Sequence, residues 1–187
     1  YTMDNKNLVE VLLFASNEPL TQNKLNQVLF DGEFIDLAET VKLINEAYKS
    51  SNKGLHIDKI AGGYQLLSRP DYHLYIQRLL NKSKKVKLSK AALEALSIIA
   101  YKQPISRVEI ESIRGVECGS VIKTLMEREV VTIKGRDEGV GRALLYGTTQ
   151  RFLELFGLNH ISDLPKLKEI DALINEGEVP IASDEIK

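Results

Sequence analysis

LVEVLLFASNEPLTQNKLNQV, residues 8–28, aligns without a gap with LEALSIIAYKQPISRVEIESI, residues 93–113, at a constant offset of 85 positions. Apolar residues fall on apolar residues along both stretches, and a proline followed by a hydroxyl residue recurs at the same places. So long a match predicts an internal repeat, in which two copies of one folding unit follow each other along the chain.

Each copy is predicted to begin with an amphipathic helix. Leu8, Val11 and Ala15 follow the spacing i, i+3 and i+7, which places them on one face of a helix. The residues at the same places in the second copy are Leu93, Leu96 and Ala100. With 187 residues, of which 43% are hydrophobic, the chain is long enough for two small cores.

A proline ends each first helix, and a second helix follows. Leu20 and Ile105 are each expected to occupy one buried, extended position after the proline. Thr21 and Ser106 come next, where a hydroxyl can accept hydrogen bonds from the free N–H groups of the second helix. Ser106 and Glu109 also have the S-x-x-E spacing of a capping box.

A third helix and a β-hairpin complete each copy. In the first copy, Asp36 with Glu39 is expected to cap a helix whose apolar face consists of Leu37, Val41, Ile44 and Tyr48. In the second copy, the helix is marked by Val121, Ile122 and Leu125. Strand-like runs then flank glycine-containing turns, at residues 55–60 and 64–68 and at residues 130–134 and 143–147. One more amphipathic segment follows each hairpin.

This order predicts an α+β fold that is mainly α, with two tandem winged-helix domains of three helices and a hairpin wing each. We expect the first domain at residues 3–80 and the second at residues 91–165. Residues 81–90 carry five lysines and no acidic residue, which indicates an exposed basic linker. Residues 166–187 end in a polar, acidic mixture without aromatic residues, so this tail is expected to be partly disordered.

The composition limits the functional classes. The formal net charge is −1, so no global field attracts nucleic acid or an anionic membrane. Cys118 is the single cysteine, which excludes an internal disulfide and fits a reducing cytoplasm. No apolar run approaches the 18 or so residues of a membrane span, so we expect a cytoplasmic protein with no membrane contact.

Winged helices often bind DNA, and a winged-helix DNA-binding transcriptional regulator is the alternative function. The helices that would enter the major groove fall within residues 36–49 and 117–129, and each stretch has three acidic and two basic side chains. Both would repel the phosphates that supply non-specific affinity. At most we expect weak, non-specific backbone contact by the lysine-rich linker and by Lys134, Arg136 and Arg142.

Catalysis is not expected. His56, His73 and His160 are scattered, Cys118 has no neighbouring histidine, and no metalloprotease, hydrolase or phosphate-loop motif occurs. His56 alternates with apolar neighbours in a predicted strand, which indicates a solvent-facing side chain. We therefore expect no enzymatic activity, no cofactor and no metal site.

Two long stretches carry a resemblance to a known family. LSKAALEALSIIAYKQPISRVEIESIRGV, residues 88–116, and GRDEGVGRALLYGTTQRFLELFGL, residues 135–158, closely resemble the bacterial segregation and condensation protein B family. The first copy resembles it too, through LVEVLLFASNEPLT and GGYQLLSRPDY, so the likeness covers nearly the whole chain. One departure is Ala143 after Arg142, where the family usually has proline.

The resemblance implies a non-enzymatic subunit of the bacterial chromosome-condensing SMC complex, associated with the nucleoid during the cell cycle. It further implies a homodimer, joined mainly through the first winged-helix domain. The implied partner is the kleisin subunit, segregation and condensation protein A, which would connect this chain to the SMC protein.

The resemblance does not itself name the residues that contact the kleisin or the second copy. For kleisin binding we select residues within or beside the family-like stretches of the second domain: Tyr101, Arg107, Arg114, Arg136, Arg142, Tyr146 and Phe152. The three aromatic residues among them have a second interpretation, which is that they fill the core. For the dimer interface we select Val9, Leu12 and Leu13, because the first helix has more apolar surface than one core needs.

Overall fold

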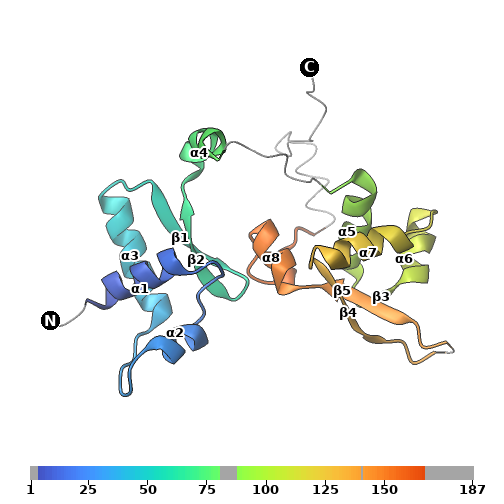
Figure 1. The fold of residues 1–187 in the computed structure, drawn as a ribbon, viewed down its shortest axis with the longest axis horizontal. Coiled ribbons are helices and arrows are strands. Elements are labelled where there is room, and N and C mark those ends of the chain that lie inside the picture. The colour runs from blue at the N-terminus through green and yellow to red at the C-terminus, as the bar shows by residue number, and fades with distance from the viewer. Residues whose placement is uncertain (1–3, 81–87, 140, 167–187) are drawn as a thin grey trace.

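The computed structural model describes residues 4–80, 88–139 and 141–166, so most of the expected linker and tail lies outside the described residues. Figure 1 shows the described elements in two groups along the long axis. The first group comprises α1 (Asn5–Ala15), α2 (Gln22–Val28), α3 (Leu37–Ser50), β1 (Leu55–Ile60), β2 (Gly63–Ser68), a 3-10 turn (Pro70–Tyr72) and α4 (His73–Leu79). The second comprises α5 (Lys90–Lys102), β3 (Ile105–Ser106), α6 (Arg107–Arg114), α7 (Gly119–Glu127), β4 (Val131–Arg136), β5 (Leu144–Thr148), α8 (Gln150–Phe156) and a 3-10 turn (Ile161–Asp163).

In the first unit, the predicted caps and the predicted hairpin are confirmed. The Thr21 hydroxyl accepts a hydrogen bond from the N–H of Lys24, and the Asp36 carboxylate accepts one from the N–H of Glu39. β1 and β2 pair in antiparallel register. The turn between them places Ala61 and Gly62 at φ of 52° and 78°, the left-handed geometry that suits the twist of a tight hairpin.

In the second unit, the strands form a three-stranded sheet in the order β3-β5-β4. The capping box at the start of α6 is present as predicted. The Ser106 N–H and hydroxyl both donate to the Glu109 carboxylate, at 2.8 and 2.7 Å, and the Glu109 N–H returns a bond to the hydroxyl. These bonds hold the pKa of Glu109 below its usual value.

The buried apolar residues form two clusters, one in each unit. Val9, Leu25, Ile44 and others belong to the first cluster, and residues such as Ile99, Ile110 and Leu125 belong to the second. Two sets of three helices followed by a hairpin, each around its own core, confirm the predicted class of tandem winged helices with a mixed, mainly helical composition.

The gapless offset fails in the first helix. The second helices begin at Gln22 and Arg107, which are 85 residues apart, but the first helices end at Ala15 and Lys102, which are 87 apart. The loop after α1 is thus two residues longer than the loop after α5. Two positions turn a helix by about 200°, so α1 buries a different face from the one that the alignment predicts.

The core-facing residues of α1 are therefore Val9 and Leu13, which are 0% and 4% exposed. Leu12 is partly buried against the same core. These three residues were expected at a dimer interface, but Val9 and Leu13 offer no surface to a second copy. Val11 and Phe14 lie on the open side of α1 instead, 60% and 81% exposed.

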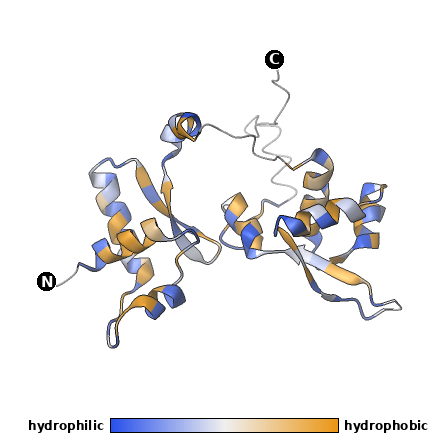
Figure 2. Cartoon of the chain, viewed as in Figure 1, coloured by the Kyte–Doolittle hydropathy of each residue, from blue (hydrophilic) through white to orange (hydrophobic). Residues whose placement is uncertain are grey.

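The helices that follow the two hairpins differ in burial. α8 buries Phe152 against the second core, whereas α4 has no buried residue. In Figure 2, part of α4 is coloured as hydrophobic, although this helix stands apart from the rest of its unit. The sequence pattern predicted two equivalent amphipathic segments, and only the second packs on a core.

Replacing the buried cap tests the junction between the first two helices of the second unit. Ser106→Ala removes both hydrogen bonds of the hydroxyl, so we expect the free energy of unfolding to fall by about 1 kcal/mol. Urea denaturation measures this change. The matched control is Ser97→Ala on the exposed side of α5, with an expected change within about 0.5 kcal/mol. Equal losses for the two variants would contradict the role of the cap.

Candidate partner-binding site

A cavity of about 330 Å³ lies between α7 and β5, beside the start of α6. Ile122 and Tyr146 form its buried apolar wall, and the partly buried Met126 lies next to them. Arg107, Lys123 and Glu127 supply its charged side chains, and Gly119 completes the lining. The site therefore combines an apolar interior with charges at its edge, which is the composition of peptide-binding pockets.

The apolar wall follows from the pattern of α7 and the pairing of β5. Ile122 and Leu125 point into the core, and Met126 lies at i+4 from Ile122 on the margin of the same stripe. Tyr146 occupies the central strand, where it pairs with Ile105 of β3 on one side and Ile133 of β4 on the other. The wall is thus built on a helix and a sheet, so its position is fixed by the core.

A polar chain positions Arg107 at the edge of the cavity. Its Nε donates to Glu111 Oε1 at 2.7 Å, and the same oxygen accepts the N–H of Cys118 at 2.9 Å. The bond from Cys118, followed by the guanidinium of Arg107, lowers the pKa of Glu111. Glu111 in turn raises the pKa of Arg107. Glu111 is therefore a carboxylate that holds both the start of α7 and the guanidinium.

Gly119 permits this arrangement. A Cβ atom at this position would lie 3.0 Å from Arg107 Nη1 and 3.1 Å from Cζ, which is closer than ordinary contact. The guanidinium therefore lies directly against the first turn of α7, and any larger residue at position 119 would push it aside.

Cys118 belongs to the core. It is fully buried at the start of α7, and burial, followed by the nearby Glu111 carboxylate, raises the pKa of its thiol. A protonated, inaccessible thiol is neither a nucleophile nor a metal ligand.

The residues selected from the sequence fall into separate places. Arg107 and Tyr146 meet in the cavity. Arg136 and Arg142 lie together on the second hairpin, where Arg136 Nη1 donates to the Arg142 carbonyl oxygen at 3.3 Å. Tyr101 lines another cavity, and its hydroxyl donates to the carbonyl oxygen of Pro165 at 2.7 Å.

Two selected residues are not surface residues. The Arg114 side chain is 6% exposed and its Nη2 donates to Glu94 at 3.4 Å, so it ties α6 to α5. Phe152 is 2% exposed, with its ring 4.6 Å from that of Phe156. Phe152 and Tyr146 thus fit the alternative interpretation as core residues, although Tyr146 also borders the cavity.

Five residues of the cavity were not selected from the sequence: Gly119, Ile122, Lys123, Met126 and Glu127. The spacing of Lys123 and Glu127 at i, i+4 from each other, beside the apolar stripe of α7, was a usable signal. Nothing in the sequence pointed to Gly119, because its role depends on the approach of a side chain from α6.

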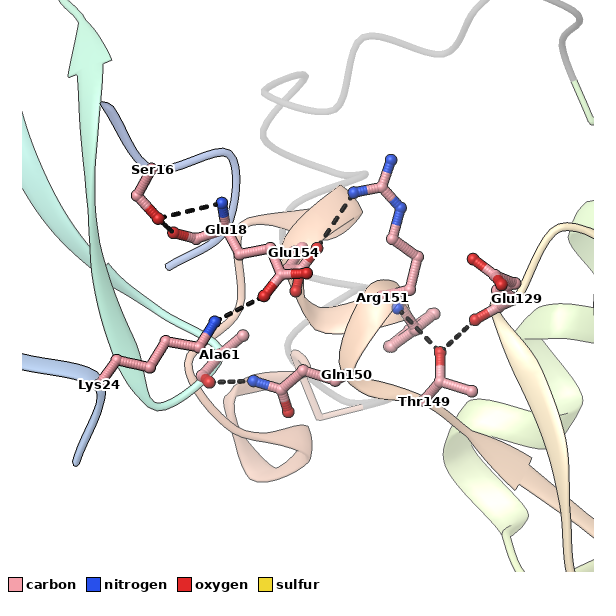
Figure 3. Close-up of polar contacts among 10 residues, drawn as sticks. Ser16, Glu18, Lys24, Ala61, Glu129, Thr149, Gln150, Arg151 and Glu154 are labelled. Carbon is pink, nitrogen blue, oxygen red and sulfur yellow. Dashed lines mark hydrogen bonds and ion pairs between the residues drawn. The ribbon is translucent and has the colours of Figure 1, made fainter. Parts of the chain in front are cut away.

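The two units touch through the tip of the first hairpin. The Ala61 N–H donates to the Leu158 carbonyl oxygen at 2.9 Å, and the Gly62 N–H donates to Asn159 Oδ1 at 3.0 Å. Figure 3 shows the third bond, from the Gln150 amide to the Ala61 carbonyl oxygen. Ala61 is 4% exposed as a result. The hairpin tip therefore docks on the segment that begins at α8.

Two other kinds of site are absent from the described residues. Among residues 4–80, 88–139 and 141–166, no three His, Cys, Asp or Glu side chains gather as a metal site would require. Over the same ranges, no helix has the length and apolarity needed to cross a membrane.

A family model and curated relatives agree on one family. Residues 7–167 match the family model described as segregation and condensation complex subunit ScpB. Segregation and condensation protein B of Desulforamulus reducens is 46% identical over 92% of this chain and 93% of its own length. The protein of the same name from Syntrophotalea carbinolica is 41% identical over 95% of this chain and 89% of its own.

Solved structures are also similar. The crystal structure of ScpB from Mycobacterium tuberculosis is 28% identical and covers 84% of this chain and 99% of that chain, with a TM-score of 0.39. A conserved hypothetical protein from Chlorobium tepidum is 34% identical, with coverages of 82% and 98% and a TM-score of 0.37.

The polar chain around Glu111 predicts a pH-dependent stability. A carboxyl group whose pKa is lowered on folding stabilises the protein above its unfolded value of 4.5, and this contribution is lost as the pH falls below that value. Glu111→Gln should therefore lower the melting temperature at pH 7, and the difference from the original protein should shrink as the pH falls below about 4.5.

The matched control is Glu138→Gln on the second hairpin, because the Glu138 side chain has no ion pair within the described residues. Thermal denaturation followed by circular dichroism between pH 3 and pH 7 or so measures both variants. A Glu111→Gln effect that is independent of pH would contradict the role of the charged carboxylate.

Proposed function

This chain belongs to the segregation and condensation protein B family, and we propose that it is a non-enzymatic subunit that binds the kleisin of a bacterial SMC complex. The family model is that of a subunit of the segregation and condensation complex, which supports a role in chromosome partition and condensation. In the proposed assembly, the chain is a homodimer and is connected to the SMC protein through the kleisin, segregation and condensation protein A.

The observation that carries the proposal is the cavity between α7 and β5. An amphipathic segment of the kleisin would place an apolar side chain against Ile122, Met126 and Tyr146. A carboxylate on the same segment would meet the guanidinium of Arg107, whose donors are held in a fixed orientation by Glu111. Burial of apolar surface supplies the affinity, and the arginine sets the register.

The surface of α7 argues against the alternative, a DNA-binding regulator. Lys123 lies 3.8 Å from Glu127, so the lysine on the outer face of this helix is already paired with a carboxylate. A helix that enters the major groove needs cations free to neutralise phosphates. A partner peptide that buries apolar surface fits this helix better than a duplex does.

The exposed apolar residues of the first unit support the proposed dimer. Val11 and Phe14 on α1 are joined by Phe30 and Phe34 in the loop between α2 and α3, at 79% and 74% exposed. Isolated monomers seldom leave so many large apolar side chains in water. A second copy that covers them would bury the three phenylalanines of this unit together with Val11.

Two substitutions at the cavity test kleisin binding. Met126→Asp places a charge on the apolar wall, and Arg107→Ala removes the guanidinium, so each should weaken binding by about 2 kcal/mol, or roughly thirtyfold. Isothermal titration of the purified kleisin measures the affinity. Lys102→Ala, on the exposed end of α5, is the control and should bind as the original protein does.

Gly119→Ala tests the position of the Arg107 guanidinium separately from folding. The added Cβ displaces this flexible side chain, and the backbone angles at position 119 suit alanine. It should weaken kleisin binding while the melting temperature stays the same or rises. Kleisin binding by all three variants at the level of Lys102→Ala would contradict the site. Tight duplex binding that falls steeply with salt, without kleisin binding, would favour the regulator.

Charges on the open face of α1 test the dimer. Val11→Glu combined with Phe14→Glu should convert the dimer to a monomer, because two buried carboxylates would face their own copies. Light scattering after gel filtration measures the mass. The matched control is Val108→Glu with Ile113→Glu, two exposed apolar positions of α6, which should leave the mass unchanged. A dimer that persists in the α1 variant would exclude this face.

A further inference from the structure

A second concave surface lies in the first unit, between α3 and the hairpin of β1 and β2. It consists of two adjoining cavities of about 400 and 470 Å³ that share Asn45 and Lys49. We call this surface the α3 groove. It is remote in sequence from the cavity of the second unit and shares no residue with it.

The floor of the α3 groove is apolar and rigid. Val41, Tyr48 and Ile57 are each at most 4% exposed. The Asn45 side chain fixes the spacing between helix and strand, because its Nδ2 donates to the Ile57 carbonyl oxygen at 2.8 Å and its Oδ1 accepts the Ile57 N–H at 2.9 Å. The groove is therefore held open by the core of the unit and by this pair of bonds.

The rim of the α3 groove is strongly basic. Its charged lining consists of Lys42, Lys49, Lys53, Lys59 and Arg69, against the single carboxylate of Glu46. Lys53 and Arg69 have carboxylate neighbours, Glu10 at 3.9 Å and Asp71 at 3.6 Å. Within residues 4–80, 88–139 and 141–166, the other three lysines have no ion pair.

The summed charge of residues 36–49 does not reveal this basic rim. Asp36 and Glu39 lie at the start of the helix, where they belong to its cap, whereas Lys42 and Lys49 lie further along and line the groove. The net acidic sum of residues 36–49, which includes the cap, is thus correct and yet describes no single surface. The groove itself would attract an acidic ligand.

The same chain contains a segment of matching chemistry. Residues 169–186 read EIDALINEGEVPIASDEI, with six acidic and no basic side chains. Apolar residues alternate with the acids, including Ile170, Leu173, Ile174 and Val179. This composition suits an apolar floor between rows of cations. We propose that residues 167–187 of the chain bind in the α3 groove of the same molecule.

The chain connections allow this contact. Lys59 on the rim is two residues from Ala61, whose N–H donates to the Leu158 carbonyl oxygen. Lys166 follows Leu158 by eight residues, which span at most about 29 Å, and the 21 residues beyond it span at most about 75 Å. The hairpin tip thus anchors the groove near the segment from which the tail continues.

Duplex DNA fits the groove less well. Phosphates would meet the lysines of the rim, but they would leave the apolar floor uncovered, so burial would add nothing to their affinity. An acidic segment with apolar side chains uses both parts of the surface. The contact is independent of the kleisin site, since it involves the first unit and the tail alone.

A spin label on the tail of the full-length protein tests the proposal. Glu176→Cys supplies the attachment point for the label. The original protein, whose single cysteine Cys118 is fully buried, is treated with the same label as a control for stray labelling. The label should broaden the amide NMR signals of Lys42, Lys49 and Lys59, and those of Ser97 and Lys123 in the second unit should stay sharp. Raising the salt from about 0.1 to about 1 M shortens the Debye length from about 10 to about 3 Å and should weaken the broadening.

Charge reversal provides the matched comparison. Lys49→Glu with Lys59→Glu should abolish the broadening, whereas Lys90→Glu with Lys102→Glu, two exposed lysines of the second unit, should preserve it. Absent or uniform broadening across the protein would overturn the contact. A second sample mixes isotope-labelled protein without a spin label and spin-labelled protein without isotopes. Broadening of the same groove signals in this mixture would assign the tail to a second copy and overturn the contact within one molecule.

Discussion

The residue between the first two helices of each unit is buried and extended, so its backbone N–H and C=O must find partners inside the protein. In the first unit, the Leu20 N–H donates to the Tyr64 carbonyl oxygen at 2.8 Å, and the Tyr64 N–H donates back at 2.9 Å. In the second unit, Ile105 pairs with Tyr146 in the same way. These bonds join the helices to the hairpin, and each core closes around the joint. The close approach also requires Gly63, because a Cβ there would lie 2.9 Å from the Leu20 carbonyl oxygen.

This constraint explains which parts of the fold could be predicted from the sequence. From the proline onward, the two copies keep the same spacing, because the extended residue, the capping hydroxyl and the second helix depend on one another. Before the proline, nothing enforces the spacing, and the two extra residues after α1 turn that helix about its axis. Val11 and Phe14 match buried residues of α5 in the alignment but lie in water. A repeat thus predicts the elements reliably, and it predicts the buried face only where no loop intervenes.

The candidate site was only partly predictable for a related reason. The family-like stretches contain residues that build the core as well as residues that face a partner, and sequence similarity does not separate the two. Phe152 belongs to the core and the Arg114 side chain is buried between helices, whereas Arg107 lies at the edge of the cavity. Gly119 matters only because the guanidinium of another helix lies against it, and such a contact has no sequence signal. Val9 and Leu13, which were selected for the dimer interface, are buried for the same reason, and the selection of Leu12 stays a prediction.

Electrostatics distinguishes the two units more sharply than their folds do. Residues 36–49 and 117–129 are both net acidic, yet Lys123 of α7 pairs with Glu127, whereas Lys42 and Lys49 of α3 have no ion pair in the described part of the chain. Charge therefore has to be summed over a surface, since the acids that cap a helix lie at its end and leave the later turns unbalanced. The proposed binding in the cavity depends mainly on buried apolar surface and should be screened little by salt, whereas the proposed binding in the basic groove should weaken strongly as salt rises. The duplicated winged helix thus presents two surfaces of different character, and we expect the proposed kleisin contact to persist at a salt concentration that weakens the proposed tail contact.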